Sequence, residues 1–290
     1  MLDSVRALYA QTADHYQPAI AQPMEALARS LAAWMARCVR DNAQGTLHDP
    51  FDLPQRGACP HVNLALDVGT GTGILARYMA GFARRVIGVD ISAPMLALGQ
   101  IAAPNIALCE ADLHRLPLPA ARLDLIGASF GLNHGVPQRA LPELARVLRP
   151  NGLLICQEWG AMDDLSYAFE ATFAEMLENL EPVATPALDL PDDWQTHLQD
   201  AEDYYVSFKE AGFSLVWARE SPFVSVTFPS EREFVAYKLA WASRRLRFER
   251  FTEDARRACL EKLYAALAPY RAADGKLIWQ PPLIRLCAIR

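Results

Sequence analysis

The residues best suited to chemistry form a glycine-rich segment preceded by an acid. Residues 64–73 read Leu-Ala-Leu-Asp-Val-Gly-Thr-Gly-Thr-Gly, an apolar run that ends in Gly69, Gly71 and Gly73. Small residues in such a turn let a ligand approach the backbone, and the N-terminus of a following helix offers free N–H groups. The G-x-G-x-G spacing differs from the G-x-G-x-x-G of dinucleotide-binding folds. A carboxylate at Asp67, two residues before the first glycine, suits a ligand that carries an ammonium group.

Two further acids follow short apolar runs. Asp90 ends the run 85–89, and we expect it to accept hydrogen bonds from ribose hydroxyls at the end of a second parallel strand. Asp112 follows the run 105–109, where it suits the exocyclic amine of adenine. One ligand carries an amino acid, a ribose and an adenine, so the three acids predict S-adenosylmethionine as cofactor and S-adenosylhomocysteine as product. The residues expected to contact it are Asp67, Gly69, Thr70, Gly71, Gly73, Asp90, Ile91, Met95, Ala111, Asp112, Leu113, Ser129 and Tyr9.

Four segments resemble the class I S-adenosylmethionine-dependent methyltransferases, in particular the small-molecule branch typified by ubiquinone and menaquinone biosynthesis methyltransferases. They are LALDVGTGTG (64–73), VIGVDISAPMLALG (86–99), EADLHRLPLPAARLDLIGASFGLNH (110–134) and LPELARVLRPNGLLI (141–155). The resemblance covers residues 60–160 well and the remainder loosely. Two positions depart from the family pattern, Asn151 in place of a glycine and Gln138 in place of a frequent acid. Neither is an expected cofactor contact.

Alternating apolar runs and helical patterns position these residues. We expect strands at 64–68, 85–90, 105–109, 123–128 and 152–158, with helices at 72–82, 93–100 and 137–148 between them. This order predicts a Rossmann-like α/β fold. The resemblance implies a mostly parallel seven-stranded sheet with an antiparallel last strand and helical cap insertions. Cys109 and Cys156 fall in strands and are expected to be buried.

The segments outside this core read mostly as helices. Residues 1–40 show helical spacing, and residues 41–60 are rich in turn formers and read as a loop. Further helices are expected at 161–182, 194–211, 230–248 and 252–268, and strands at 213–218, 222–228 and 277–289. We therefore interpret 1–290 as a single methyltransferase domain. In it, 1–40 is a lid, 60–160 the cofactor-binding core, and 161–212 and 229–270 are cap and substrate regions.

The loop after the fourth strand, 129–134, is where the methyl group should meet its acceptor, because ligands bind outside the carboxyl ends of parallel strands. A base is needed only if the acceptor must lose a proton, and His134 is the natural candidate near neutral pH. His15 and Tyr16 are rivals, since residues 8–16 resemble the family's N-terminal lid. The segment lacks the aspartate cluster of metal-dependent catechol-type enzymes, so no metal is expected.

Composition narrows the remaining possibilities. A net charge of −6 argues against a nucleic-acid partner, and no apolar stretch approaches the roughly 20 residues that span a bilayer. Scattered cysteines without C-x-x-C pairs and the lack of a secretory pattern favour a cytoplasmic location. We expect a monomer or homodimer that acts on a small molecule. The expected activity is methyl transfer to O, N or C of a small apolar or aromatic metabolite. The alternative is a cofactor-binding protein without methyl transfer, either a partner subunit or a catalyst of another reaction in the same pocket. A nicotinamide-dependent oxidoreductase is disfavoured by the glycine spacing and by Asp67.

Overall fold

The computed structural model describes residues 2–52, 61–99, 103–133, 135–179 and 198–290. The chain forms two compact units, each assembled from three separate segments. Unit 1 comprises residues 1–26, 161–191 and 222–282, and unit 2 comprises residues 27–160, 192–221 and 283–290. The glycine-rich segment and the three acids all belong to unit 2.

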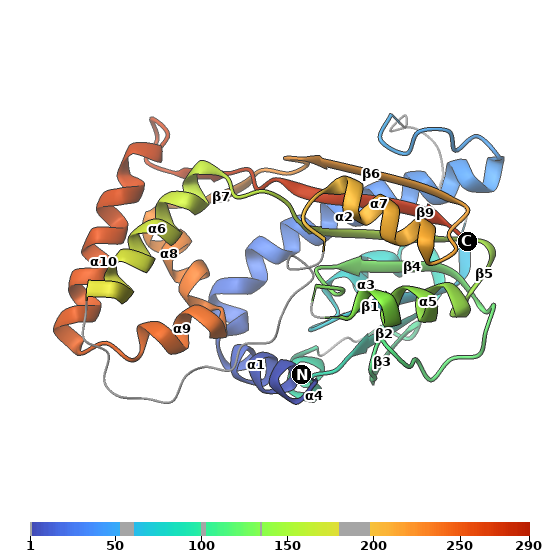
Figure 1. Ribbon diagram of the computed structural model, residues 1–290, viewed down its shortest axis with the longest axis horizontal. Helices are drawn as coiled ribbons and strands as arrows, with labels where there is room; N and C mark the ends of the chain where they lie inside the picture. Colours follow the sequence, from blue (N-terminus) through green and yellow to red (C-terminus); the bar gives the residue numbers. More distant parts are fainter. Residues whose placement is uncertain (1, 53–60, 100–102, 134, 180–197) are drawn as a thin grey trace. The chain divides into compact units, whose positions relative to one another are not determined.

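Unit 2 is built on one seven-stranded sheet with the strand order β3-β2-β1-β4-β5-β9-β6 (Figure 1). Its strands are β1 (Val62–Val68), β2 (Ala83–Asp90), β3 (Ile106–Glu110), β4 (Leu123–Ser129), β5 (Leu148–Trp159), β6 (Leu215–Ser221) and β9 (Leu283–Ile289). Strands β1 to β5 pair in parallel, and β9 runs antiparallel to both β5 and β6. The expected sheet, mostly parallel with an antiparallel last strand, is confirmed.

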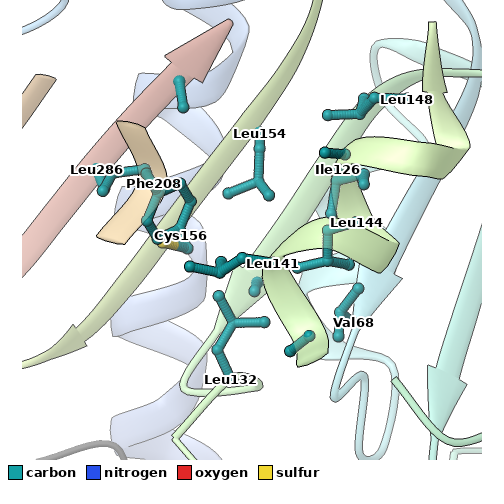
Figure 2. Packing of buried hydrophobic residues seen from close by; sticks show 14 of the residues in the cluster. Val68, Ile126, Leu132, Leu141, Leu144, Leu148, Leu154, Cys156, Phe208 and Leu286 are labelled. Atoms are coloured by element: carbon teal, nitrogen blue, oxygen red, sulfur yellow. The ribbon is translucent and has the colours of Figure 1, made fainter. Parts of the chain in front are cut away.

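Helices cover both faces of this sheet (Figure 1). They are α2 (Ala21–Gln44, in unit 2 from Leu27 onward), α3 (Ile74–Met79), α4 (Ala93–Leu98), α5 (Pro137–Val147) and α7 (Ala201–Glu210). On one face, Leu141 and Leu144 of α5 and Phe208 of α7 pack onto Ile126 and Leu154 (Figure 2). On the other face, Met35 of α2 and Met79 of α3 lie against Gly127 of β4.

This double cover explains the composition of the central strands. Leu123 to Ala128 of β4 are buried without interruption, because a parallel strand between two helical layers has no solvent-facing side. The rule fails at the sheet edge. Cys109, expected to be buried, is exposed: in the edge strand β3, Ala107 and Cys109 point to the same face of the sheet and both are exposed, whereas Ile106 and Leu108 on the opposite face are half-buried.

Unit 1 is mainly helical. Its elements are α1 (Leu2–His15), a π-helical turn (Tyr16–Ile20), α6 (Asp164–Asn179), α8 (Glu231–Ala240), α9 (Ala242–Phe248), α10 (Glu253–Leu267), a 3₁₀ turn (Ala268–Tyr270), and a two-stranded antiparallel sheet of β7 (Val226–Phe228) and β8 (Leu277–Trp279). Its core is aromatic: Phe228 packs against Phe234, Tyr237 and Trp279, with ring centroids 5.2 to 6.3 Å apart. Such ring pairs add to the stabilisation that area burial alone provides.

A buried lysine lies within this aromatic core. Lys238 is 8% exposed and 5.4 Å from the ring centroids of Phe234 and Trp279, and burial lowers its pKa to about 8. Its Nζ donates to Ser166 Oγ at 3.0 Å. Ser166 donates in turn to Asp163, which also accepts from Trp279 Nε1 at 3.0 Å. This polar chain joins the start of α6 to α8 and β8 and compensates the buried ammonium charge.

Three segments differ from their expected structure. Residues 277–289 form two strands in two different sheets, because Pro281 and Pro282 interrupt the run and proline offers no N–H to a ladder. Residues 230–248 form two helices, divided at Trp241, whose backbone is extended (φ −67°, ψ 129°). The supposed loop 41–60 begins as helix, since α2 continues to Gln44.

Candidate active site

The glycine-rich segment forms a tight turn between β1 and α3. Gly69, Gly71 and Gly73 all have positive φ, at 65°, 54° and 76°. At Gly71, among the described residues, a side chain would meet only Met95 Cε, 3.4 Å from the position of an added Cβ, so the described chain leaves the space in front of this backbone otherwise open. The turn therefore offers accessible backbone at the carboxyl end of β1.

Gly69 is required for another reason. An added Cβ there would lie 2.3 Å from Gly131 Cα, and one on Gly131 would lie 1.9 Å from the carbonyl oxygen of Val68. The turn after β1 and the loop after β4 thus touch backbone to backbone. Two glycines, 62 positions apart in the chain, make this approach possible. The importance of Gly131 was not predicted from the sequence, where the residue shows no local pattern.

Asp67 lies beneath the turn. Its side chain is 1% exposed, and its Oδ2 accepts from Thr70 Oγ1 at 2.6 Å. Burial raises the pKa of this carboxyl to about 7, although hydrogen bonds from Thr70 and from the backbone N–H of Ala76 oppose the increase. Ala76 is in the first turn of α3, so Asp67 satisfies one of the N–H groups that a helix start leaves unpaired. The nearby charge of Asp90 also raises the pKa, which shows that the two acids lie close together.

Asp90 links the turn to the start of α4. Its Oδ2 accepts from the N–H of Gly71 and its Oδ1 from the N–H of Ser92, both at 2.8 Å. Burial raises its pKa, and these backbone donors oppose the increase. Ser92 caps α4 by accepting from the N–H of Met95. Asp90 therefore holds the glycine turn in place as well as bordering the space in front of it.

Asp112 is the third acid, at the carboxyl end of β3. Its Oδ1 accepts from the backbone N–H of His114 at 2.9 Å and contacts His114 Nδ1 at 2.7 Å. The side chain is 25% exposed, so it also faces solvent. His114 was missed by sequence reasoning, because its role depends on Val136, which is distant in the chain and donates to Nε2 at 2.8 Å.

Strands β1, β2 and β3 are adjacent and parallel, so their carboxyl ends lie side by side. Asp67, Asp90 and Asp112, which lie at or just after these ends, therefore share one end of the sheet. The other predicted cofactor contacts follow the same strands. Met95 is 3% exposed and lies by Gly71, whereas Ile91, Ala111 and Leu113 are half-buried. The structure brings these residues of unit 2 together, and their contact with a cofactor remains a prediction.

The loop after β4 is strained and anchored to β5. Phe130 has φ 60°, unusual for a large side chain, and its ring stacks on Trp159 with centroids 4.0 Å apart. The N–H of Leu132 donates to Glu158 Oε1 at 3.1 Å, and Glu158 is only 1% exposed. A bulky residue is held at positive φ only when its surroundings determine the backbone conformation, and here the contacts of Phe130 and Leu132 with β5 supply those surroundings.

A buried polar network leads away from Ser129 at the end of β4. Gln157 Nε2 donates to Ser129 Oγ at 3.0 Å, and Arg285 Nη2 donates to Gln157 Oε1 at 3.1 Å and to Ser30 Oγ at 2.9 Å. Arg285 is 4% exposed, and burial lowers its pKa to about 10. The network ties the ends of β4 and β5 to β9 and α2. Sequence reasoning did not single out Gln157 or Arg285.

Among the described residues, no contact joins a catalytic candidate to Asp67, Asp90 or Asp112. His134 lies outside the described residues. His15, Tyr16 and Tyr9 belong to unit 1, where His15 is exposed and Tyr16 is 6% exposed. Their roles, the lid at 1–40, and the cap and substrate regions at 161–212 and 229–270 remain predictions.

Two absences apply to the described parts of the chain. Within them, no group of three or more His, Cys, Asp or Glu side chains is arranged to hold a metal ion. No helix among the described residues is both long and apolar enough to cross a bilayer.

Comparison with known proteins agrees with the geometry. Residues 66–156 match the family described as "Methyltransferase domain". A demethylmenaquinone methyltransferase of Renibacterium salmoninarum is 36% identical over 104 residues, which cover 36% of this chain and 44% of that protein. A malonyl-[acyl-carrier protein] O-methyltransferase of Enterobacter lignolyticus is 29% identical over 189 residues, which cover 61% of this chain and 66% of that protein. The chain thus spans less than two thirds of the length of either relative.

A solved structure supports the fold. The YcgJ protein of Bacillus subtilis superposes with a TM-score of 0.51 at 15% sequence identity, covering 80% of this chain and 93% of that one. The sheet order, the glycine turn with its acids and the matched domain together define the protein class. Residues 66–156 form a methyltransferase domain, and the sheet order and glycine turn agree with the class I S-adenosylmethionine-dependent type that the sequence resembles.

Proposed function

We propose that this protein transfers the methyl group of S-adenosylmethionine to O, N or C of a small apolar or aromatic metabolite. The observation that carries the proposal is the edge formed by β1, β2 and β3, where Asp67, Asp90 and Asp112 follow one another beside an open glycine turn. This order suits the amino acid, ribose and adenine of one cofactor. The names of the two relatives, a quinone-pathway methyltransferase and an O-methyltransferase, support a small-molecule acceptor.

The cofactor, when bound, supplies an activated methyl group on a sulfonium, so the protein needs mainly to position the two reactants. Asp90 retains lone pairs on both oxygens after accepting from Gly71 and Ser92, and these are available to ribose hydroxyls. The bare backbone at Gly71 permits close approach of the amino-acid part. The loop around Phe130 follows the end of β4, next to the carboxyl end of β1, and is the part of unit 2 best placed to contact the acceptor.

A catalytic base is needed only for an acceptor that must lose a proton. His134, His15 and Tyr16 remain the candidates for that role. Replacing each in turn, by Asn at the histidines and by Phe at Tyr16, tests them. Replacement of the residue that acts as the base should lower kcat by about 100-fold or more and leave the Kd for S-adenosylhomocysteine unchanged.

The proposal is tested first at the level of the cofactor. S-adenosylhomocysteine should raise the Tm of the protein, and NAD should not, because only a ligand that binds the folded state stabilises it. Transfer of a radiolabelled methyl group to a panel of quinols, phenols, amines and carboxylic acids then identifies the acceptor. Stabilisation without transfer to any compound would favour the alternative of a cofactor-binding subunit. Stabilisation by NAD alone would refute the proposal.

A further inference from the structure

His114 forms a buried link between the end of β3 and the start of α5. Its side chain is 1% exposed, and both ring nitrogens are engaged, Nδ1 with Asp112 Oδ1 at 2.7 Å and Nε2 with the N–H of Val136 at 2.8 Å. A backbone N–H can only donate, so Nε2 must be the acceptor and Nδ1 must carry the hydrogen. The neutral ring with Nδ1–H therefore donates to Asp112.

This contact orients the Asp112 carboxylate. Oδ1 receives two hydrogen bonds, one from the ring and one from the backbone N–H of His114. Among the described residues, Oδ2 receives none, and the side chain keeps 25% of its exposure. The protein thus fixes Oδ1, and Oδ2 stays available to a hydrogen-bond donor of a bound ligand. Rotation of the carboxylate would break both bonds to Oδ1, so the imidazole, together with the backbone N–H of His114, sets the direction in which Oδ2 faces.

The segment that follows His114, residues 116–118, is attached to α5 by contacts that do not involve His114. The N–H of Leu116 donates to Glu143 Oε1 at 2.7 Å, and Arg146 donates to the carbonyl oxygens of Leu116 and Leu118. Glu143 and Arg146 also pair with each other on α5. The chain after β3 therefore stays attached to α5 through these contacts, and the separate contribution of the imidazole is the orientation of one carboxylate.

We propose that His114 is a positioning residue that aims Asp112 at the 6-amino group of adenine and so makes the site select adenine over hypoxanthine. The proposal rests on the proposed function, which places a cofactor of the S-adenosyl class at this edge. The selectivity follows from chemistry: a carboxylate oxygen accepts from an amine, whereas a 6-oxo group faces it with another acceptor. A carboxylate free to rotate would lose much of this discrimination.

The test compares two ligands, S-adenosylhomocysteine and its deaminated analogue S-inosylhomocysteine, by calorimetry. In the wild type the ratio of their Kd values should be about 10- to 150-fold, the range expected for one hydrogen bond to a charged group. His114→Gln still offers an acceptor to Val136 but brings no donor to Asp112, and its ratio should fall below about threefold. His114→Asn places an amide N–H near the position of Nδ1, and it should retain most of the wild-type ratio.

Glu143→Ala is the matched control. It removes the acceptor of the Leu116 N–H without touching Asp112. Its affinity for both ligands should fall together, so the ratio should stay at the wild-type value. A merely structural role of His114 would make His114→Gln behave in the same way as this control.

The outcomes separate the inference from the function on which it rests. A wild-type ratio in His114→Gln, or a ratio near one in the wild type, would overturn the role of His114 while leaving methyl transfer intact. No binding of either ligand to the wild type would refute the proposed function itself. If His114→Gln does not fold, ¹⁵N NMR of the wild type decides, with His114 assigned through His114→Asn. A ring protonated on Nε2 instead of Nδ1 would overturn the inference.

Discussion

The buried carboxyl of Asp67 should make the stability of the unliganded protein depend on pH. Burial raises its pKa from 3.8 to about 7. Between these values the unfolded chain has lost this proton and the folded protein still holds it, so the free energy of unfolding falls as the pH rises. This stabilisation is fully present below about pH 4 and is lost by about pH 7. At 1.36 kcal/mol per pKa unit, the change amounts to about 4 kcal/mol.

Asp67→Asn is the perturbation that isolates this effect. The amide is neutral at every pH and can accept from the N–H of Ala76 while donating to Thr70, so the local hydrogen bonds can be kept. Urea denaturation of both proteins from pH 4 to 8 measures the difference. The wild type should lose about 4 kcal/mol relative to the variant over that range. Asp90 also has a raised pKa and contributes to the pH dependence of both proteins, so the measured difference contains Asp67 together with its charge coupling to Asp90. Parallel stability curves would show that Asp67 is already ionised in the folded state and would refute the reasoning.

The same carboxyl should report cofactor binding. An ammonium group beside Asp67 favours the charged form, so binding at pH 6 should release up to one proton per site. Calorimetry in buffers of different ionisation enthalpy measures this release, and Asp67→Asn is the control that should show none. A binding enthalpy independent of the buffer in the wild type would mean that the cofactor's ammonium lies elsewhere.

Further predictions concern the turn and its neighbours. Gly71→Val should abolish binding of S-adenosylhomocysteine while the protein still unfolds cooperatively, and tight binding in calorimetry would contradict the open space assigned to this position. Gly131→Ala should cost about 2–3 kcal/mol in urea denaturation, because the added methyl group would overlap the backbone at Val68, and a neutral effect would mean that the two loops separate easily. Asp90→Ala should weaken cofactor binding by about 2–4 kcal/mol through lost ribose contacts and a loosened turn; wild-type affinity would exclude that role. Methyl transfer should survive EDTA, and a loss restored by Mg²⁺ would show that a metal takes part.

The sheet could be predicted from the sequence because its physical basis is local. Largely apolar runs such as 123–128, in which only Asp124 is charged, identify strands covered on both faces, and the glycines mark the turn after β1. The predictions failed where a partner elsewhere in the chain decides the outcome. Cys109 lies on the exposed face of the edge strand β3, and residues 277–289 divide between two sheets.

The site shows the same division. The three acids follow apolar runs and were found by that pattern. The burial of Asp67 under the turn, where the first turn of α3 and Thr70 donate to its oxygens, could not be predicted from that pattern, and its contact with the cofactor stays a prediction. The role of His114 could not be predicted from the sequence, because it depends on a hydrogen bond from the backbone N–H of Val136, which is distant in the chain. Gly131 was equally hidden, since what it permits is contact with a turn far back in the sequence.

The place of β9 between β5 and β6 has a consequence for the order in which the protein folds during synthesis. Among the strands that the structure describes, β6 pairs with β9 alone, and residues 222–282 separate the two strands. At about 5–20 residues per second, the ribosome needs several seconds to make that stretch. Throughout this interval β6 lacks this strand partner. The five parallel strands that carry Asp67, Asp90 and Asp112 have no such delay, because all of them precede β6 in the chain. The cofactor edge can therefore assemble on the nascent chain before the other side of the sheet is closed.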